Sequence, residues 1–286
     1  MADTAPVVFA DWLAAHLRDD LCILDIRSAV DGGGAAAYEQ AHIPGAVHTD
    51  YVKDGWRASK GMATGMLPDK AALAALFAHL GLRPDQHVVV VGAGTSPADF
   101  SAAARVYWTL KIAGHRRLSI LAGGMAAWRQ HGGPLESGRR APAPAPGYPI
   151  ERVDGLRADL AAVERIVAER GAILLDSRPA NYFEGRAKSP QARRAGRLPG
   201  ATHLDYTHAF DPTAGRLKTQ GELEALFALP ALPVVNYCNT GQQAAANWFI
   251  LSELLGRPQV RLYDGSMSEW TEDEQRPVEV GAAGAT

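Results

Sequence analysis

The sequence predicts an α/β protein in which one domain with a parallel sheet is present twice. Short runs rich in β-branched residues alternate with stretches of helical character, as in domains whose parallel sheet is covered by helices. Several short segments of the first half also recur, in the same order, in the second half. With 286 residues, the chain is long enough for two domains of about 130 residues each.

Three pairs of segments carry the repeat. Residues 22–28 (CILDIRS) match residues 173–179 (ILLDSRP), residues 43–51 (IPGAVHTDY) match residues 198–206 (LPGATHLDY), and residues 124–128 (GMAAW) match residues 266–270 (SMSEW). Because the order of the pairs is kept, we interpret the chain as a duplicated fold.

The pattern of apolar residues predicts the helices and strands of each copy. In the first copy we expect a helical lead-in at 7–20, strands at 21–26, 88–91 and 118–121, and helices at 70–80 and 102–113. In the second copy we expect strands at 234–237 and 260–263 and a helix at 221–228. Ligands of such domains bind beyond the carboxyl ends of the parallel strands.

The expected domain boundaries follow from the repeat and from a Pro-rich connector. The first domain is expected at 7–135, a linker at 136–150 and the second domain at 151–280. Within the linker, residues 141–147 (APAPAPG) predict an extended, semi-rigid segment.

Composition and charge narrow the classes of function. A hydrophobic content of 47% and a formal charge of -2 are typical of a globular protein, and nothing in this balance calls for nucleic acid as a partner. No apolar run approaches the roughly 20 residues of a membrane span, and the N-terminus lacks the basic and apolar regions of a secretory signal. Only Cys22 and Cys238 are present, which fits a reducing compartment. We therefore expect a cytoplasmic protein.

The sequence around Cys238 predicts a reactive thiol. Residues 234–251 (VVNYCNTGQQAAANWFIL) are typical of a short buried strand, a polar loop and a helix, with Cys238 at the strand end. The first amides of a helix have no intrahelical partner and carry the positive end of its dipole, so they favour a thiolate. Gly241 permits a positive φ, which lets the loop amides form an anion-binding nest.

A second interpretation of Cys238 is a buried structural thiol, because free Cys is among the most frequently buried residue types. The polar loop, the helix start and the repeat favour the reactive thiol. Cys22, inside a strand-like run with no loop behind it, is interpreted as a core residue.

The corresponding loop of the first copy has no thiol. After Val91 the chain continues as GAGTSPADF (residues 92–100), so this half cannot perform the same nucleophilic step. The loop also lacks the third glycine of G-x-G-x-x-G and the Gly-Lys-Ser/Thr of a P-loop, which argues against phosphate binding there.

Taken together, the repeated Asp-x-Arg strand ends, the Pro-Gly-Ala turns, the Met-x-x-Trp strand exits and the Cys loop resemble the tandem-domain rhodanese family of thiosulfate and 3-mercaptopyruvate sulfurtransferases. The resemblance covers roughly residues 7–275. It implies two domains with parallel five-stranded sheets, and a catalytic Cys in the second domain that opens a six-residue loop. That loop is formed here by Cys238, Asn239, Thr240, Gly241, Gln242 and Gln243.

The resemblance implies a sulfurtransferase that needs no cofactor and no metal. The Cys238 thiolate takes sulfur from a small-molecule donor and passes it, as a persulfide, to cyanide or a thiol. Thiosulfate-type loops of the family usually read Cys-Arg-Lys-Gly and mercaptopyruvate-type loops Cys-Gly-Ser/Thr-Gly. Thr240 and Gly241 match the mercaptopyruvate type, whereas Asn239, Gln242 and Gln243 match neither.

Three further residues are candidates by alignment with the family. Asp50 takes the place of an acidic residue proposed to act in mercaptopyruvate enzymes, and here it is either an accessory group of the site or a structural residue. The His of the family's His-Met-Leu-Pro stretch is Gly65 in this chain. The loop 186–197 carries five cations, of which Arg186 and Lys188 are the candidates for binding the donor. A solvated basic loop without this role is the competing interpretation.

Two alternative functions fit parts of the sequence. A Cys-loop phosphatase needs an Arg six residues after the Cys, and that position is Ala244. A catalytically silent module with the same fold is favoured by the altered Asn239, Gln242 and Gln243, and disfavoured by Cys238 itself.

Overall fold

A computed structural model describes residues 4–31, 33–145, 147–212 and 215–282, and these residues fold into two compact units. The first unit contains residues 1–56, 68–153 and 212–216, and the second contains residues 57–67, 154–211 and 217–286. The short segment 57–67 thus comes from the first half of the chain but belongs to the second unit.

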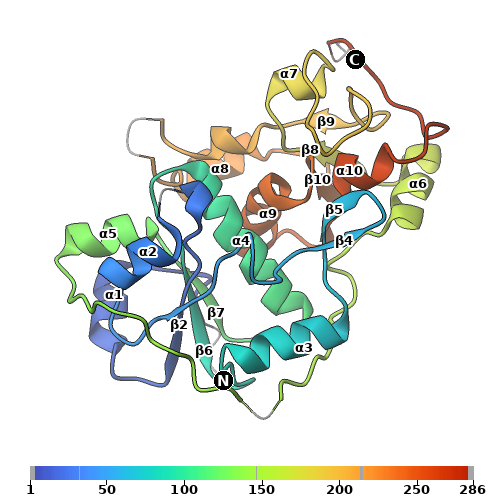
Figure 1. Ribbon diagram of the computed structural model, residues 1–286. Helices are drawn as coiled ribbons and strands as arrows, with labels where there is room; N and C mark the ends of the chain where they lie inside the picture. Colours follow the sequence, from blue (N-terminus) through green and yellow to red (C-terminus); the bar gives the residue numbers. More distant parts are fainter. Residues whose placement is uncertain (1–3, 32, 146, 213–214, 283–286) are drawn as a thin grey trace. The chain divides into compact units, whose positions relative to one another are not determined.

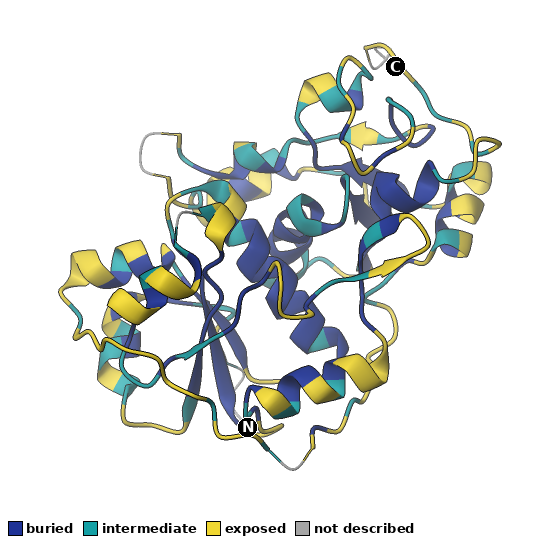
Figure 2. Ribbon diagram, in the orientation of Figure 1, coloured by how far each residue is buried: buried dark blue, intermediate teal, exposed yellow. Residues whose placement is uncertain are grey.

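The first unit holds a five-stranded parallel sheet with the strand order β1-β7-β6-β2-β3, of which β7, β6 and β2 are labelled in Figure 1. Its elements, in chain order, are β1 (Val7–Val8), α1 (Ala10–His16), β2 (Leu21–Asp25), η1 (Ala29–Asp31), α2 (Gly34–Gln40), β3 (Val47–His48), α3 (Lys70–His79), β6 (His87–Val91), α4 (Pro97–Ile112), β7 (Leu118–Leu121) and α5 (Gly124–His131). Every residue of β6 is buried, and its four consecutive valines are typical of a central strand of a parallel sheet (Figure 2).

The second unit holds a four-stranded parallel sheet with the order β11-β10-β8-β9 and a separate antiparallel hairpin, β4–β5. Its elements are β4 (Ala58–Lys60), β5 (Ala63–Met66), α6 (Leu160–Glu169), β8 (Ile173–Asp176), α7 (Ala180–Phe183), β9 (Thr202–His203), η2 (Tyr206–Ala209), α8 (Gln220–Leu226), β10 (Val234–Tyr237), α9 (Gln242–Phe249), η3 (Ile250–Leu254), β11 (Val260–Leu262) and α10 (Ser266–Trp270).

The two sheets differ in their outermost strand. In the first unit β1 pairs with β7 through Val7 and Val8. In the second unit the equivalent pairing is a single parallel bridge between Arg157 and Leu262. The expected five strands are therefore found in the first unit, and the fifth is reduced to one bridge in the second.

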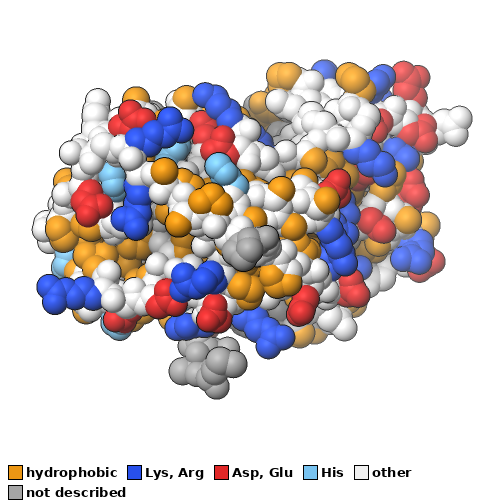
Figure 3. Space-filling model, turned by 60° about the horizontal axis from the view of Figure 1, so that its bottom comes forward, with side chains coloured by type: hydrophobic (Ala, Val, Ile, Leu, Met, Phe, Trp, Pro, Cys, Tyr) orange, Lys and Arg blue, Asp and Glu red, His pale blue; other side chains and the backbone are white. Residues whose placement is uncertain are grey.

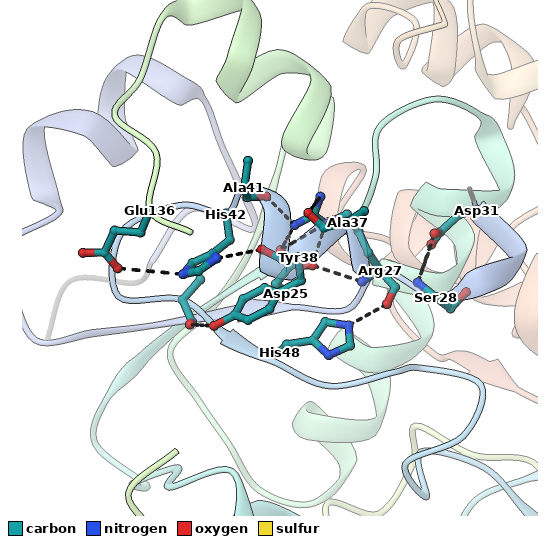
Figure 4. Close-up of polar contacts among 11 residues, drawn as sticks. Asp25, Arg27, Ser28, Asp31, Ala37, Tyr38, Ala41, His42, His48 and Glu136 are labelled. Carbon is teal, nitrogen blue, oxygen red and sulfur yellow. Dashed lines mark hydrogen bonds and ion pairs between the residues drawn. The ribbon is translucent and has the colours of Figure 1, made fainter. Parts of the chain in front are cut away.

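Each copy repeats a buried ion pair at a strand end. Arg27 contacts Asp25 at 2.7 Å and donates to the carbonyl of Ala41, while the ring of His48 contacts the Arg27 carbonyl at 2.9 Å (Figure 4). In the second copy Arg178 contacts Asp176 at 2.6 Å. The same ion pair thus occurs at the matching strand end of both copies, and the duplicated sequence has kept its tertiary role.

Charged side chains of both signs are interspersed on the face shown in Figure 3, in keeping with the formal charge of -2. Across the residues that the structure describes, every helix is too short or too polar to span a lipid bilayer.

His87 couples the stability of the first unit to pH. It is the first residue of β6 and is buried, with its Nε2 2.8 Å from Ser119 Oγ. Because the Ser119 hydroxyl donates to the Ala5 carbonyl, Nε2 is the donor to Ser119. Burial, aided by the charge of Arg117, lowers the pKa of His87 to about 4.

We predict that His87→Phe reduces the acid lability of the protein. Between about pH 6.5 and 4 the unfolded chain binds a proton at His87 that the folded chain does not, so stability falls as pH falls through this window. Urea unfolding at pH 7 and near pH 4.5 should show that the free energy of unfolding of wild type falls between these two pH values. In His87→Phe the fall should be smaller by roughly 2–3 kcal/mol. An equal pH dependence in both proteins would contradict the assignment.

Candidate active site

Cys238 lies directly after β10, at the carboxyl end of a strand that is flanked by β11 and β8. The residue is almost completely buried, with 1% of its surface exposed. The loop that follows is more open, since Asn239, Thr240 and Gln242 are partly exposed. Cys238 therefore forms the floor of a polar loop at the sheet edge where parallel α/β domains bind ligands.

The loop after Cys238 turns at Gly241, which has φ +76° and is the N-cap of α9. This is the left-handed conformation that a residue with a Cβ adopts only at a cost. Within the described part of the chain, the backbone N–H groups of Asn239, Thr240 and Gly241 donate to no protein acceptor. Three consecutive amides next to the thiol are thus available to an anion at the start of a helix.

The backbone of Cys238 is held by the start of α10. Its N–H donates to Ser266 Oγ at 3.0 Å, and its carbonyl accepts from Met267 N at 3.1 Å. The next carbonyl, of Asn239, accepts from Ser268 N at 3.0 Å. The amide of Cys238 is therefore used for attachment to α10, and the anion-binding role falls to the amides after it.

The buried cation Arg178 lies near the end of β10, with its guanidinium 5.9 Å from the centre of the Tyr237 ring. Burial opposes the charge of Arg178, but the carboxylate of Asp176 outweighs it and raises the pKa of Arg178, with a smaller contribution in the same direction from Cys238. The Arg178 guanidinium therefore stays charged, and it is paired with Asp176, which lies beside Tyr237 in the sheet.

The β4–β5 hairpin packs on α10 and on the Cys238 loop. Thr64 N donates to Ser268 Oγ at 3.3 Å, and that hydroxyl lies 3.0 Å from the Thr64 carbonyl and 2.7 Å from the Gly265 carbonyl. Leu67 N donates to the carboxylate of Asp264 at 2.6 Å. A segment from the first half of the sequence therefore helps to hold the elements around Cys238.

Gly65 is the point where this hairpin meets the loop. It has φ +83°, and a Cβ placed on it would lie 2.3 Å from the carbonyl oxygen of Thr240. The position aligned with the family His is thus one where the fold leaves no room for a side chain.

The first copy shows how the same backbone is used without a thiol. Met125 N donates to the Gly92 carbonyl at 2.9 Å, as Met267 N does to that of Cys238. In this loop the amides of Thr95 and Ser96 both donate to the carboxylate of Asp99. Two amides of the first-copy loop are therefore bonded to a side chain of that loop's own helix.

The candidate cations form local contacts. Arg186 is exposed and pairs with Glu184, and Lys188 Nζ donates to the Ala192 carbonyl at 2.8 Å. No contact among the described residues joins Arg186 or Lys188 to Cys238. Their role in binding a donor stays a prediction.

Asp50 lies in the first unit, where its Oδ1 accepts from Val52 N at 2.9 Å and from Lys53 N at 3.2 Å. These bonds close a turn after the Pro-Gly-Ala segment, which accounts for a structural role. Its accessory role in catalysis stays a prediction.

The side-chain amide groups of Asn239 and Gln243 add further polar atoms to the loop. Among the residues that the structure describes, Asn239 Oδ1 and Gln243 Oε1 are buried without a hydrogen-bond partner, while the side chain of Gln242 is partly exposed. The loop carries no formal charge of its own, so its polarity comes from amides and from the Thr240 hydroxyl.

Cys22 provides the contrast to Cys238. It lies inside β2, is buried in the core as expected, and its pKa is raised by burial to about 12. Both thiols are free, but only Cys238 has a polar loop and unpaired amides behind it.

Ser266, Asp264 and Gly65 were not identified as site residues from the sequence. One signal was present for Ser266, because the repeat aligns it with Gly124. Asp264 contacts Leu67 and Gly65 contacts Thr240, so each contact joins residues far apart in the chain. No local sequence pattern predicts such contacts.

Comparison with known proteins places this geometry in a family. Residues 9–131 and 159–273 match the Rhodanese-like domain. The chain is 36% identical to a probable 3-mercaptopyruvate sulfurtransferase of Pseudomonas aeruginosa, over 97% of this chain and 99% of that protein, and 33% identical to a thiosulfate sulfurtransferase of Corynebacterium glutamicum, over 96% and 90%. The crystal structure of the 3-mercaptopyruvate enzyme SseA of Escherichia coli superposes with a TM-score of 0.76 at 30% identity, over 94% of this chain and all of SseA.

We predict that Gly65→Ala displaces the hairpin from the Cys238 loop. The added methyl group would clash with Thr240, so the rate of Cys238 alkylation by iodoacetamide should rise several-fold, and the free energy of unfolding should fall by about 1–3 kcal/mol.

The matched control is Gly155→Ala. Gly155 has a similar φ of +89° in the same unit, but a Cβ there would meet nothing within 4 Å. It should lose stability through backbone strain without a change in the alkylation of Cys238. Equal alkylation rates in the two variants would refute the contact.

Proposed function

The chain belongs to the rhodanese family and is a sulfurtransferase, and from this premise we propose that Cys238 is the residue that carries the transferred sulfur. The observation that carries the proposal is the position of Cys238 itself. It lies at the carboxyl end of β10, followed by three amides that have no acceptor in the described part of the chain.

The reaction proceeds in two displacements. The Cys238 thiolate attacks the thiol sulfur of 3-mercaptopyruvate or the outer sulfur of thiosulfate, and an S–S bond forms that leaves a persulfide on Cys238. With 3-mercaptopyruvate the C–S bond breaks, its electron pair stays on carbon, and the proton of the donor thiol ends on the methyl group of pyruvate. With thiosulfate the S–S bond breaks and its electron pair leaves with sulfite. An acceptor thiolate or cyanide then attacks the outer sulfur, and the Cys238 thiolate is regenerated.

The loop supplies the electrostatic part of this chemistry. The amides of Asn239, Thr240 and Gly241 stabilise a negative charge on the Cys238 sulfur before the transfer and on the outer persulfide sulfur after it. Because these amides are fixed by the turn at Gly241, little reorganisation is needed during the reaction.

As donor we propose 3-mercaptopyruvate ahead of thiosulfate. The support is the uncharged loop, in which Thr240 and Gly241 follow the mercaptopyruvate pattern and no cation stands where a dianion would need one. Relatives of both activities match at similar identity, so the proposal rests on the loop chemistry. Arg186 and Lys188 are proposed to attract the anionic donor from solvent, and Gln242 and Gln243 to contact it.

We further propose that the protein acts in the cytoplasm. The support is that both cysteines are free, because a nucleophilic thiol persists in a reducing compartment.

We predict that sulfur transfer depends on Cys238 and prefers 3-mercaptopyruvate. In a panel of thiosulfate, 3-mercaptopyruvate and glutathione persulfide, with cyanide or dithiothreitol as acceptor, the highest kcat/KM should be found with 3-mercaptopyruvate. Cys238→Ser should reduce kcat by about 10³-fold or more, because a Ser hydroxyl is not ionised in this environment.

The control is Cys22→Ala, which removes the other thiol in the core and should keep kcat while losing stability. Activity that persists in Cys238→Ser would remove Cys238 from the mechanism. A preference for thiosulfate would overturn the proposed donor while leaving the nucleophile in place.

A further inference from the structure

Ser266 has a backbone conformation that is unfavourable for its residue type. Three residues other than Gly have a positive φ in the described part of the chain, namely Arg170, Gln259 and Ser266. The first two are exposed, whereas Ser266 is fully buried, with φ +50°. Strained residues persist when their surroundings enforce them, and they cluster at functional sites.

The duplicated fold shows what this position requires. In the first copy the aligned residue is Gly124, with φ +52°, and the next residue, Met125, donates to the strand-end carbonyl just as Met267 does. The backbone path is therefore the same in both copies. Gly follows it without strain in the copy that has no thiol, and Ser follows it in the copy that has Cys238.

The side chain of Ser266 joins two strand ends. Its hydroxyl donates to the Tyr263 carbonyl at 2.8 Å, just after β11, and its oxygen accepts from Cys238 N at 3.0 Å, just after β10. A hydroxyl has one proton to donate and lone pairs to accept with, so both bonds form together. Gly124 has no side chain with which to form either bond.

We propose that Ser266 is a positioning residue that fixes the backbone of Cys238 for attack on the sulfur donor. The proposal rests on the proposed role of Cys238 as nucleophile. With Ser266 and Met267 bound to its N–H and its carbonyl, the Cys238 backbone is held on both sides, and the sulfur moves only by rotation of its own side chain. The Ser266 hydroxyl thus helps to align the Cys238 sulfur with the backbone amides of the loop.

A set of variants at this position separates alignment from stability. Ser266→Gly removes the hydroxyl and also relieves the backbone strain, Ser266→Ala removes the hydroxyl and keeps the strain, and Ser266→Thr keeps a hydroxyl with more strain. The order of Tm is expected to be Gly at or above Ser, followed by Ala and Thr.

The order of kcat is expected to differ from the order of Tm. Loss of alignment should lower kcat by about tenfold or more in both Ser266→Gly and Ser266→Ala, with little change in KM. Ser266→Thr should recover part of kcat in spite of its lower Tm. A variant as stable as wild type that transfers sulfur poorly is the signature of a positioning role.

Thr271→Val is the matched control. Thr271 is fully buried at the end of α10, and its hydroxyl donates to the Met267 carbonyl at 2.6 Å and accepts from Arg193 N at 2.8 Å. It therefore has the same number and kind of bonds as Ser266, but none to Cys238. Its loss should lower Tm and leave kcat of the folded enzyme unchanged.

Two outcomes would overturn the proposal. One is a kcat of Ser266→Gly within about twofold of wild type, and the other is a kcat that follows Tm through the whole set, Thr271→Val included. Neither outcome can be confused with a failure of the proposed function. If Cys238 were not the nucleophile, Cys238→Ser, in which Ser266 is intact, would still transfer sulfur.

Discussion

The candidate site depends on the hydrogen bonds between the carboxyl end of β10 and the first residues of α10. Cys238 gives its N–H to Ser266 and its carbonyl to Met267, so the start of the loop is fixed on both sides. The chain then turns at Gly241 into α9, and the amides in between have no acceptor among the described residues. A fixed sulfur beside unpaired amides is what a transient sulfur anion needs for stabilisation.

The duplication separates what the fold requires from what the chemistry requires. Both copies keep the buried Asp–Arg pair and the bond from a Met amide to a strand-end carbonyl. Only the second copy adds a thiol and a hydroxyl, and it keeps Ser266 in a conformation that costs about 1–3 kcal/mol. In the first copy, Asp99 accepts from the amides of Thr95 and Ser96 and so caps the start of α4.

The sequence was sufficient for the parts of the structure that local patterns determine. The repeat, the strand that ends at Cys238 and the core position of Cys22 follow from periodicity and residue type. The contact of Gly65 with Thr240 could not be predicted, because it joins residues from different halves of the chain within one unit. In the sequence, Ser266 differs from the aligned Gly124 only in residue type. Its proposed role became clear from its positive φ angle, which a Ser rarely adopts. The fifth strand of the second sheet is reduced to one bridge, formed by the two backbone bonds of Leu262 with Leu156 and Ala158.

The central claim, that Cys238 carries the sulfur, is tested most directly by mass spectrometry of the protein after incubation with donor and without acceptor. The account predicts the added mass of one sulfur atom on the peptide that contains Cys238, and its loss when cyanide is supplied. Sulfur on Cys22 instead, or turnover of the donor with no sulfur bound to the protein, would contradict the account.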